Sequence, residues 1–163
     1  MSITCGKDHS CGIVQSPEAD LGKVRCWGKN DSNQLGLAGS PINSAVPAEI
    51  QGGLVAVQIS GGAFHTCVLK GNVVDGEIEN TGELFCFGDN TKGQLGTGNG
   101  STSVPEIVSG SHYFESASIG YQHSCGRVTG EDLYCWGSNS YGQIGQTTTG
   151  PVAIYPTPVL IVR

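Results

Sequence analysis

The segment HSCGRVTGEDLYCWGSNSYGQIG, residues 123–145, places a histidine and a cysteine before a variable stretch and a second cysteine before Trp-Gly. The same pattern occurs twice earlier, as HSCGIVQSPEADLGKVRCWGKNDSNQLG at 9–36 and HTCVLKGNVVDGEIENTGELFCFGDNTKGQLG at 65–96. The histidines recur after 56 and 58 residues, and the Cys-aromatic-Gly triplets after 60 and 49. Self-similarity on this scale is typical of propellers and stacked repeat arrays.

Composition sets limits on the function. The 163 residues include 26 glycines and 7 prolines, so one domain rich in turns is expected. No apolar run approaches the roughly 18 to 20 residues of a membrane helix, and the start MSITCGKDHS lacks the apolar core of a signal peptide. A net charge of -6, with eight scattered Lys and Arg residues, disfavours a phosphate-binding surface. We therefore expect no membrane span and no nucleic-acid partner.

Each copy contains four short strand-like segments separated by Gly, Asn, Asp and Ser. In the third copy these segments are FESASIG, HSCGRV, DLYCWG and TPVLIV. No sustained apolar stripe with helical spacing occurs, so the chain is expected to be almost entirely β. Four consecutive strands form a meander, and meanders repeated side by side are propeller blades. The prediction is a single domain over 1–163, all-β, with three four-stranded antiparallel blades at about 2–50, 51–108 and 109–163.

Three blades are too few for a closed ring, because propellers typically close with four to eight. The chain is therefore expected to form an open arc, part of a larger propeller, or a half that pairs with another copy. The ends SITCG and PTPVLIVR suggest that the units are out of phase with the blades. On that hypothesis the terminal strands would complete one another or the sheet of a partner.

A second signature follows the Cys-aromatic-Gly triplet, where every copy has Asn two residues on and ends in Gln-(Leu/Ile)-Gly. A left-handed turn is predicted just before the glutamine, at Asn33, Gly93 and Gly142, because Asn and Gly tolerate positive φ. The glutamines should then bond neighbouring backbone, while Leu35, Leu95 and Ile144 enter the core. We interpret the repeated signature as structural, with the residues His9, His65, His123, Trp27, Phe87, Trp136, Gln34, Gln94 and Gln143.

The cysteines admit several interpretations. The histidine and first cysteine are two residues apart, hence on one face of a strand, and the second cysteine lies on the next strand after 14, 18 or 9 residues. Opposed residues of a non-hydrogen-bonded antiparallel pair have Cα atoms about 4.5 Å apart, at the near limit for a disulfide, so register decides. We predict one bridge inside each blade: Cys11 with Cys26, Cys67 with Cys86, and Cys125 with Cys135.

Three alternatives to bridges stay open. A zinc site would have only three ligands per blade where structural zinc takes four, and redox catalysis lacks a C-x-x-C motif. The cysteines could also stay reduced and pack as small hydrophobes. No cofactor or metal is predicted. Bridges would indicate an extracellular or other oxidising compartment, although no export signal is visible.

Other singled-out residues are given structural roles. Cys5 is expected to be a small buried free thiol, since Gly61 and Ile119 occupy its position in the other copies. The three repeated histidines are expected to satisfy backbone groups from inside their blades. His112, outside the repeat, is expected to be an ordinary loop residue.

The pattern G-x-x-H-(S/T)-C followed by C-(W/F)-G-x-N-x-x-(G/N)-Q-(L/I)-G resembles the regulator of chromosome condensation repeat family. The resemblance covers nearly the whole chain, from Ser2 to about Val162, and it implies a β-propeller, usually of seven four-stranded blades. The added cysteine pair is similar to a subset of extracellular members, including ectodomains of crinkly-type plant receptor kinases and secreted bacterial propellers. With three repeats, this chain departs from the family in blade number.

Two functions are considered. A non-catalytic scaffold would bind a partner protein through loops that vary while the framework repeats. The acidic loop residues suited to a basic partner are Glu18, Asp20, Asp75, Glu77 and Glu79, and plain solvated hairpin tips are the alternative. The resemblance implies the second function, guanine-nucleotide exchange on a small GTPase, for which no interface residue can be matched. Catalysis is not expected, because a catalytic set should occur once and the His-Cys arrangement occurs three times.

Overall fold

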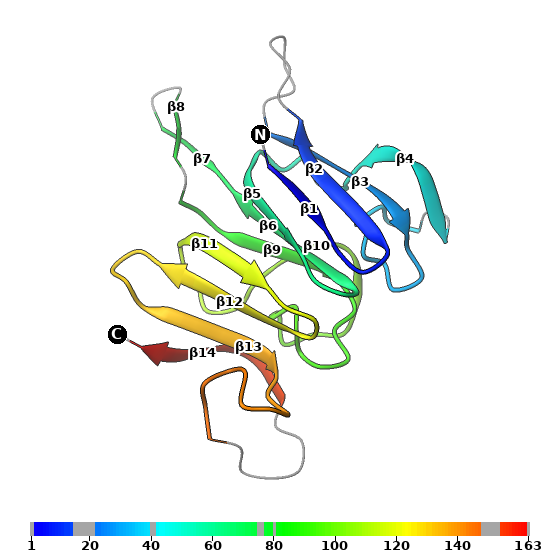
Figure 1. The fold of residues 1–163 in the computed structure, drawn as a ribbon. Helices are drawn as coiled ribbons and strands as arrows, with labels where there is room; N and C mark the ends of the chain where they lie inside the picture. The colour runs from blue at the N-terminus through cyan, green and yellow to red at the C-terminus, as the bar shows by residue number, and fades with distance from the viewer. Residues whose placement is uncertain are drawn as a thin grey trace.

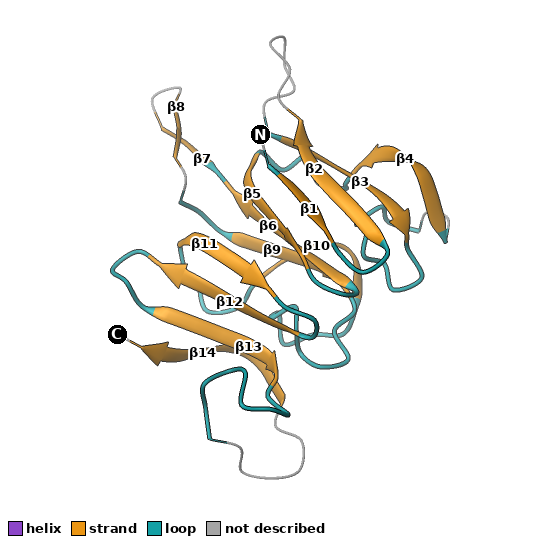
Figure 2. Ribbon diagram, in the orientation of Figure 1, coloured by secondary structure: helices purple, strands orange, loops and turns teal. Residues whose placement is uncertain are grey.

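The structure is a computed structural model, and it describes residues 2–14, 22–39, 42–74, 77–79, 81–147 and 154–162. All the regular secondary structure in these ranges is β, and none of it is helical (Figures 1 and 2). The structure therefore contains, within the described residues, no helix that could cross a membrane.

Three four-stranded antiparallel sheets account for nearly all of the fold. The first sheet contains β1 (Ile3–Cys5), β2 (His9–Val14), β3 (Lys23–Lys29) and β4 (Asn43–Glu49). The second contains β5 (Ala56–Gly61), β6 (His65–Lys70), β9 (Leu84–Gly88) and β10 (Thr102–Ile107). The third contains β11 (Phe114–Ile119), β12 (His123–Val128), β13 (Leu133–Ser138) and β14 (Ile154–Val162). We call these sheets blades 1, 2 and 3.

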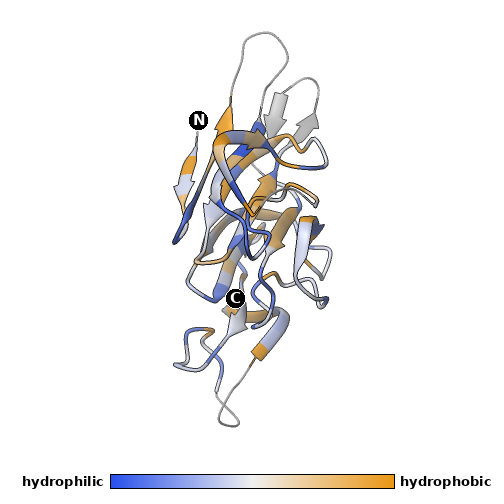
Figure 3. Ribbon diagram, turned by 90° about the vertical axis from the view of Figure 1, so that its right-hand side faces the viewer, coloured by the Kyte–Doolittle hydropathy of each residue, from blue (hydrophilic) through white to orange (hydrophobic). Residues whose placement is uncertain are grey.

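The blades stand side by side as an open arc, which confirms the partial propeller (Figure 1). Within each blade the strands follow chain order, so each is a meander. The innermost strand of blade 2, β5, contacts its counterparts β1 and β11 in the flanking blades. Apolar residues are spread over the strands of every blade, as the turned view shows (Figure 3).

The expectation that the chain ends are out of phase with the blades is wrong. Strand β1 pairs with β2 of its own sheet, through Ile3↔Gly12 and Cys5↔Ser10. Strand β14 likewise pairs with β13, through Cys135↔Val159 among others. Both terminal blades are therefore complete four-stranded sheets, because the segment before each histidine belongs to the meander that the histidine strand continues.

The connection between β6 and β9 carries an additional element that the sequence analysis treated as a loop. Strands β7 (Asn72–Val74) and β8 (Glu77–Glu79) form a separate two-stranded antiparallel sheet. It projects from one end of blade 2 (Figure 1). A long connection in this blade is thus a structured hairpin.

The core lies between blades rather than within them. One buried cluster joins blade 1 to blade 2 and comprises Cys11, Ile13, Val24, Cys26, Leu35, Ile50, Ala56, Ile59, Val68 and Phe87. A second joins blade 2 to blade 3 and comprises Cys67, Leu69, Leu84, Cys86, Leu95, Val108, Phe114, Ala117, Val128 and Trp136. In both clusters the earlier blade contributes its disulfide face, and the later blade contributes the opposite face.

The left-handed turns expected before the glutamines are confirmed, with φ of 64° at Asn33, 73° at Gly93 and 78° at Gly142. The preceding Asn of each copy closes the turn by accepting a hydrogen bond from the backbone N of the residue after Gln, with Oδ1 to N distances of 2.8 to 2.9 Å. The following apolar side chains Leu35, Leu95 and Ile144 are almost fully buried, as expected.

Candidate functional site

The cysteine pairs lie directly opposite one another on neighbouring strands. The register aligns Cys11↔Cys26, Cys67↔Cys86 and Cys125↔Cys135. Each pair forms a disulfide, and the Cα atoms are 4.1 Å apart in all three. The loop between the two cysteine strands differs in length among the copies, but the cysteines still face one another because the two strands are neighbours in every blade. Each bridge therefore closes a hairpin within one blade.

Removing a bridge is expected to lower the free energy of unfolding by about 2 to 4 kcal/mol, because the unfolded chain regains loop freedom. The double variant Cys67→Ala/Cys86→Ala tests this by urea denaturation. Alkylation under non-reducing, denaturing conditions is the control: wild type should modify at one cysteine and the variant also at one. Seven modified cysteines in the wild type would contradict the bridges.

The expectation for Cys5 is wrong, because this free cysteine is exposed. It lies at the end of the innermost strand of blade 1, where it lines a hollow of about 390 Å³ together with the first turns of blades 2 and 3. Its sulfur is 3.8 Å from the Ser10 hydroxyl. Cys5 lies on the same face of β1 as Ile3, which is 70% exposed, whereas Gly61 is covered by Thr4 and Gly6 of blade 1, so equivalent positions did not imply equal burial.

A repeated hydrogen-bond chain crosses from each blade to the next. At the first junction, His9 Nε2 lies 2.8 Å from the Thr66 hydroxyl, which donates to the carbonyl oxygen of Gln34 at 2.9 Å. Thr66 has one hydroxyl proton, so His9 Nε2 must be the donor in the first bond. The imidazole is therefore the neutral Nε2–H tautomer, with a bare Nδ1 that has no hydrogen-bond partner.

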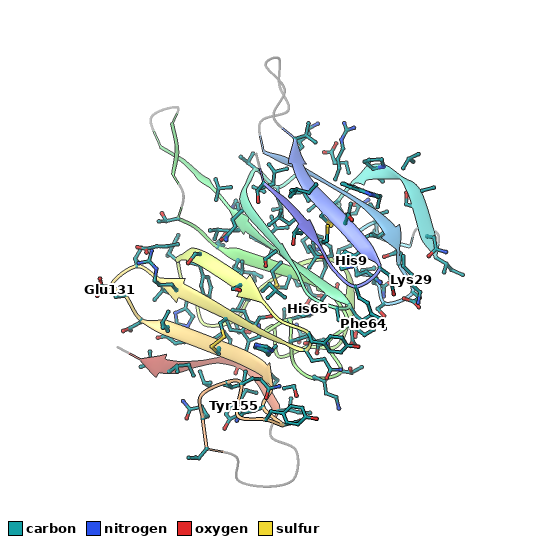
Figure 4. The ribbon with its side chains drawn as sticks, viewed as in Figure 1. His9, Lys29, Phe64, His65, Glu131 and Tyr155 are labelled. Atoms are coloured by element: carbon teal, nitrogen blue, oxygen red, sulfur yellow. A yellow bond between two sulfur atoms is a disulfide. The ribbon has the colours of Figure 1, made fainter. Side chains whose placement is uncertain are left out.

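The second junction repeats these contacts. His65 Nε2 lies 3.1 Å from the Ser124 hydroxyl, which donates to the Gln94 carbonyl at 2.8 Å. The same carbonyl accepts a 2.9 Å bond from the Trp136 indole N–H. His9 and His65 thus bond a side chain of the next blade, and for these two histidines the expectation of backbone partners inside their own blade is wrong. Figure 4 shows His9 and His65 at corresponding places in blades 1 and 2.

An aromatic ring of the later blade closes each junction over a glycine of the earlier one. Phe87 lies against Gly36, where an added Cβ would come within 2.9 Å of the ring. Trp136 lies against Gly96, where a Cβ would come within 2.6 Å of the indole nitrogen. Both rings are fully buried. The glycine that ends Gln-(Leu/Ile)-Gly is therefore required for close approach of the next blade.

The glutamine side chains act locally. Their Oε1 atoms accept hydrogen bonds from the backbone N two residues earlier, at Ser32, Lys92 and Tyr141, over 2.8 to 2.9 Å. Gln94 Nε2 also donates to Asp89 at 2.8 Å. The side chain fixes the turn, and this orients the glutamine carbonyl that receives the next blade.

Burial lowers the pKa of both junction histidines. The pKa of His9 falls to about 4 and that of His65 to about 3, although Asp8 and Asp89 respectively oppose the shift. The pKa of His123 is lowered by burial as well. His9 and His65 are accordingly neutral at pH 7. Within the described ranges, no group of three or more His, Cys, Asp and Glu side chains could hold a metal ion.

The hydrogen bonds from histidine to Ser or Thr and on to the glutamine carbonyl, which join successive blades, were not predicted from the sequence, although the sequence contains a signal for them. A Ser or Thr follows the repeated histidine in every copy, at Ser10, Thr66 and Ser124. Each lies opposite the aromatic residue of its blade, in the pairs Ser10↔Trp27, Thr66↔Phe87 and Ser124↔Trp136. His112 also has a role beyond a loop, since its ring packs 4.2 Å from Tyr134 and 5.9 Å from Phe114.

The variable connections of the three blades emerge at one edge of the arc, which we call the loop edge. It contains the ends of β2 and β3, the β7–β8 hairpin, and the β12–β13 turn with Glu131 at its tip (Figures 1 and 4). Of the predicted partner-binding residues, Glu18, Asp20 and Asp75 lie outside the described residues. Glu77 and Glu79 lie in β8, and the structure describes their backbone only.

A hollow of about 390 Å³ adjoins the loop edge between blades 2 and 3. Ile107 and Tyr113 line it and are 45% and 54% exposed. Glu83, on its wall, pairs with Lys70 at 3.3 Å. At the opposite edge, Lys7 lies 5.1 Å from the centre of the Phe64 ring, which meets Tyr121 edge-on at 5.9 Å. Both edges thus expose aromatic side chains.

Comparison with known proteins identifies the repeat. The family model of the regulator of chromosome condensation (RCC1) repeat matches residues 22–69 and 81–126, and a second RCC1 repeat model matches 114–143. The chain belongs to the RCC1 repeat family. Among curated relatives, the ultraviolet-B receptor UVR8 of Arabidopsis thaliana is 30% identical over 148 residues, which are 88% of this chain and 30% of the receptor.

Solved structures with RCC1-type folds superpose on the whole arc. Human WBSCR16 has a TM-score of 0.76 at 21% identity, covering 97% of this chain and 36% of its own. Yeast RCC1 (Prp20), solved bound to Kap60, has a TM-score of 0.77 at 19% identity, covering 99% and 36%. The chain thus spans about a third of the length of these proteins, and the likeness to them shows the fold alone.

Proposed function

We propose that this RCC1-repeat chain is a non-catalytic scaffold that binds a partner protein through its loop edge. The proposal rests on one observation: the strands, turns and disulfides are the same in all three blades, but the connections at the loop edge are not. The three blades share their turns and disulfides, whereas the connections at the loop edge differ in length and include one extra hairpin. Variable segments on a rigid frame are where recognition residues concentrate.

The chemistry of the partner follows from charge. The chain has a net charge of -6, and its sequence places six carboxylates in the β2–β3 and β6–β9 connections, of which Glu83 pairs with Lys70. A basic protein surface complements such an edge and is steered toward it at low ionic strength. The exposed Ile107 and Tyr113 beside the same edge supply apolar contact area. The proposed binding surface therefore combines acidic connections with exposed apolar side chains.

Charge removal at the loop edge tests the proposal. The variant Asp75→Asn/Glu77→Gln/Glu79→Gln should weaken binding of a folded basic probe protein by about tenfold in low salt, measured by calorimetry. The control compares the double variant Glu77→Gln/Glu79→Gln with Asp8→Asn/Asp31→Asn at the opposite edge, and it leaves Asp89 unchanged because Asp89 accepts a hydrogen bond from Gln94 Nε2. Equal weakening by the two variants, or none by either, would overturn the assignment to the loop edge.

Guanine-nucleotide exchange is the alternative that the family suggests. It predicts that the purified chain accelerates release of a fluorescent guanine nucleotide from a small GTPase. The scaffold proposal expects the release rate to stay at its intrinsic value. Acceleration that survives the loop-edge substitutions would favour the alternative and place the contact elsewhere on the arc.

A further inference from the structure

The connection between β9 and β10 carries a reactive dipeptide. Of the eight asparagines in the chain, Asn99 is the one that glycine follows. We propose that Asn99 is a site of spontaneous covalent modification, at which the backbone nitrogen of Gly100 displaces the side-chain amide, and that the isoaspartate formed there weakens the junction between blades 2 and 3. The site lies in blade 2, which has a neighbouring blade on each side, and it is independent of the loop edge.

The reaction needs only water and proceeds through a succinimide ring. The Gly100 nitrogen forms a bond to Asn99 Cγ and loses its proton, the Cγ–Nδ2 bond breaks, and Nδ2 leaves with that proton as ammonia. Water then opens the ring at one of its two carbonyls. One opening gives aspartate, and the other gives isoaspartate, in which the main chain runs through Cγ and is one methylene longer. Glycine favours ring closure because no Cβ restricts its backbone.

The surroundings of Asn99 leave room for this reaction. Asn99 and Gly100 are both exposed, and a Cβ placed on Gly100 would meet no atom within 4 Å. The hydrogen bond of the Asn99 side chain is long, at 3.5 Å from Nδ2 to Glu106 Oε2. A bond of that length is weak, so the amide can turn toward the Gly100 nitrogen.

The asparagines that close the repeated turns are protected. Asn30, Asn90 and Asn139 are buried, and the Oδ1 of each accepts a hydrogen bond from the backbone N five residues later. A carbonyl held in this bond cannot rotate toward the next backbone nitrogen. Each of these asparagines is also followed by a residue with a Cβ. The geometry therefore selects Asn99 over the asparagines of the repeat signature.

The main chain of Asn99 supports the turn that receives blade 3. The Asn99 carbonyl accepts a 2.6 Å hydrogen bond from Asn90 Nδ2, and Asn90 Oδ1 in turn holds the backbone N of Leu95. The turn closed in this way presents the Gln94 carbonyl, which accepts the hydrogen bonds from blade 3. An added methylene at position 99 displaces the carbonyl from Asn90, so the turn loses part of its closure where the two blades meet.

The same segment also bonds blade 3 directly. The backbone N of Gly98 donates to the carbonyl of Pro156 in β14 at 3.1 Å. A longer main chain at the next residue shifts this donor as well. Either product of the reaction further places a carboxylate beside Glu106, and like charges at this distance repel. The modification therefore acts on two contacts between blade 2 and blade 3.

Ageing of the purified, folded chain at mildly alkaline pH tests the site. The peptide that contains Asn99 should gain about 1 Da, because NH₂ is replaced by OH, and it should do so before the peptides with the other asparagines. An isoaspartate-specific methyltransferase with S-adenosylmethionine should label the same peptide. Gly100→Ala should slow the gain about tenfold. This variant is compatible with the fold, because Gly100 stands in open space and outside the left-handed region.

Hydrogen exchange measured by mass spectrometry tests the consequence. Amides of residues 90–98 and of β14 should exchange faster in aged than in fresh wild type, and aged Gly100→Ala should match its fresh form. Asn99→Asp is the charge control, because it adds the carboxylate at unchanged chain length, and it should accelerate exchange less than ageing does. No mass gain at Asn99, an equal rate in Gly100→Ala, unaltered exchange after ageing, or an equal effect of Asn99→Asp would overturn the proposal.

Discussion

Acidification from pH 7 to pH 5 is expected to lower the free energy of unfolding by about 4 kcal/mol through the two junction histidines alone. Burial lowers the folded-state pKa of His9 to about 4 and that of His65 to about 3, below the value of about 6.5 for an unperturbed histidine. Between pH 7 and pH 5 these two histidines become protonated in the unfolded chain, whereas in the folded chain they stay largely neutral. Stability is therefore full above about pH 6.5 and decreases as the pH falls toward the folded-state values. Urea denaturation at each pH measures the slope.

A variant without one titrating ring provides the control. His65→Gln keeps an amide N–H that can reach the Ser124 hydroxyl but cannot take up a proton near neutrality. Its stability should depend on pH with a slope smaller by about 1.4 kcal/mol per pH unit between pH 6 and pH 5. An unchanged slope would show that His65 does not titrate differently in the folded and unfolded chain.

Truncation of the buried indole is expected to have an effect of similar size. Trp136→Ala should lower the free energy of unfolding by about 3 to 5 kcal/mol, because a fully buried ring is replaced by a cavity. The truncation also leaves the Gln94 carbonyl with one hydrogen bond fewer. Thermal and urea unfolding of the purified variant measure the loss.

Trp27→Ala is the matched comparison, since Trp27 has the same place in blade 1 but is only partly buried in this structure. Its effect on the free energy of unfolding should be about 1 kcal/mol or less. Similar losses in the two variants would mean that the ring stabilises its own blade instead of the junction.

Much of the frame could be predicted from sequence because its determinants are local. The short strands, the left-handed turns and the opposed cysteines each follow from residues that lie in one blade and recur three times. The register then decides which cysteines meet, and the alternation along each strand decides which face is apolar. Because the pattern occurs three times, each of these inferences was supported independently by three segments of the sequence.

The contacts between blades were harder to predict, because they join residues 57 to 59 positions apart through side chains that have several local partners. His9 could have bonded backbone within its blade, and only the packing of blade 2 supplies Thr66. The β7–β8 hairpin, in contrast, had a visible signal. Asp75-Gly76 stands between NVV and EIE, and Asp-Gly between such runs favours a two-residue hairpin.

The placement of each disulfide within a blade has a mechanical consequence. No bridge joins one blade to another among the described cysteines, so the covalent links do not oppose separation of neighbouring blades. If the chain ends are pulled apart, blades should detach in turn, and each should keep its β-hairpin locked by its cystine. The segment inside each bridge adds no length until a reductant cleaves the bond, so extension under tension should increase in three further steps when reductant is supplied.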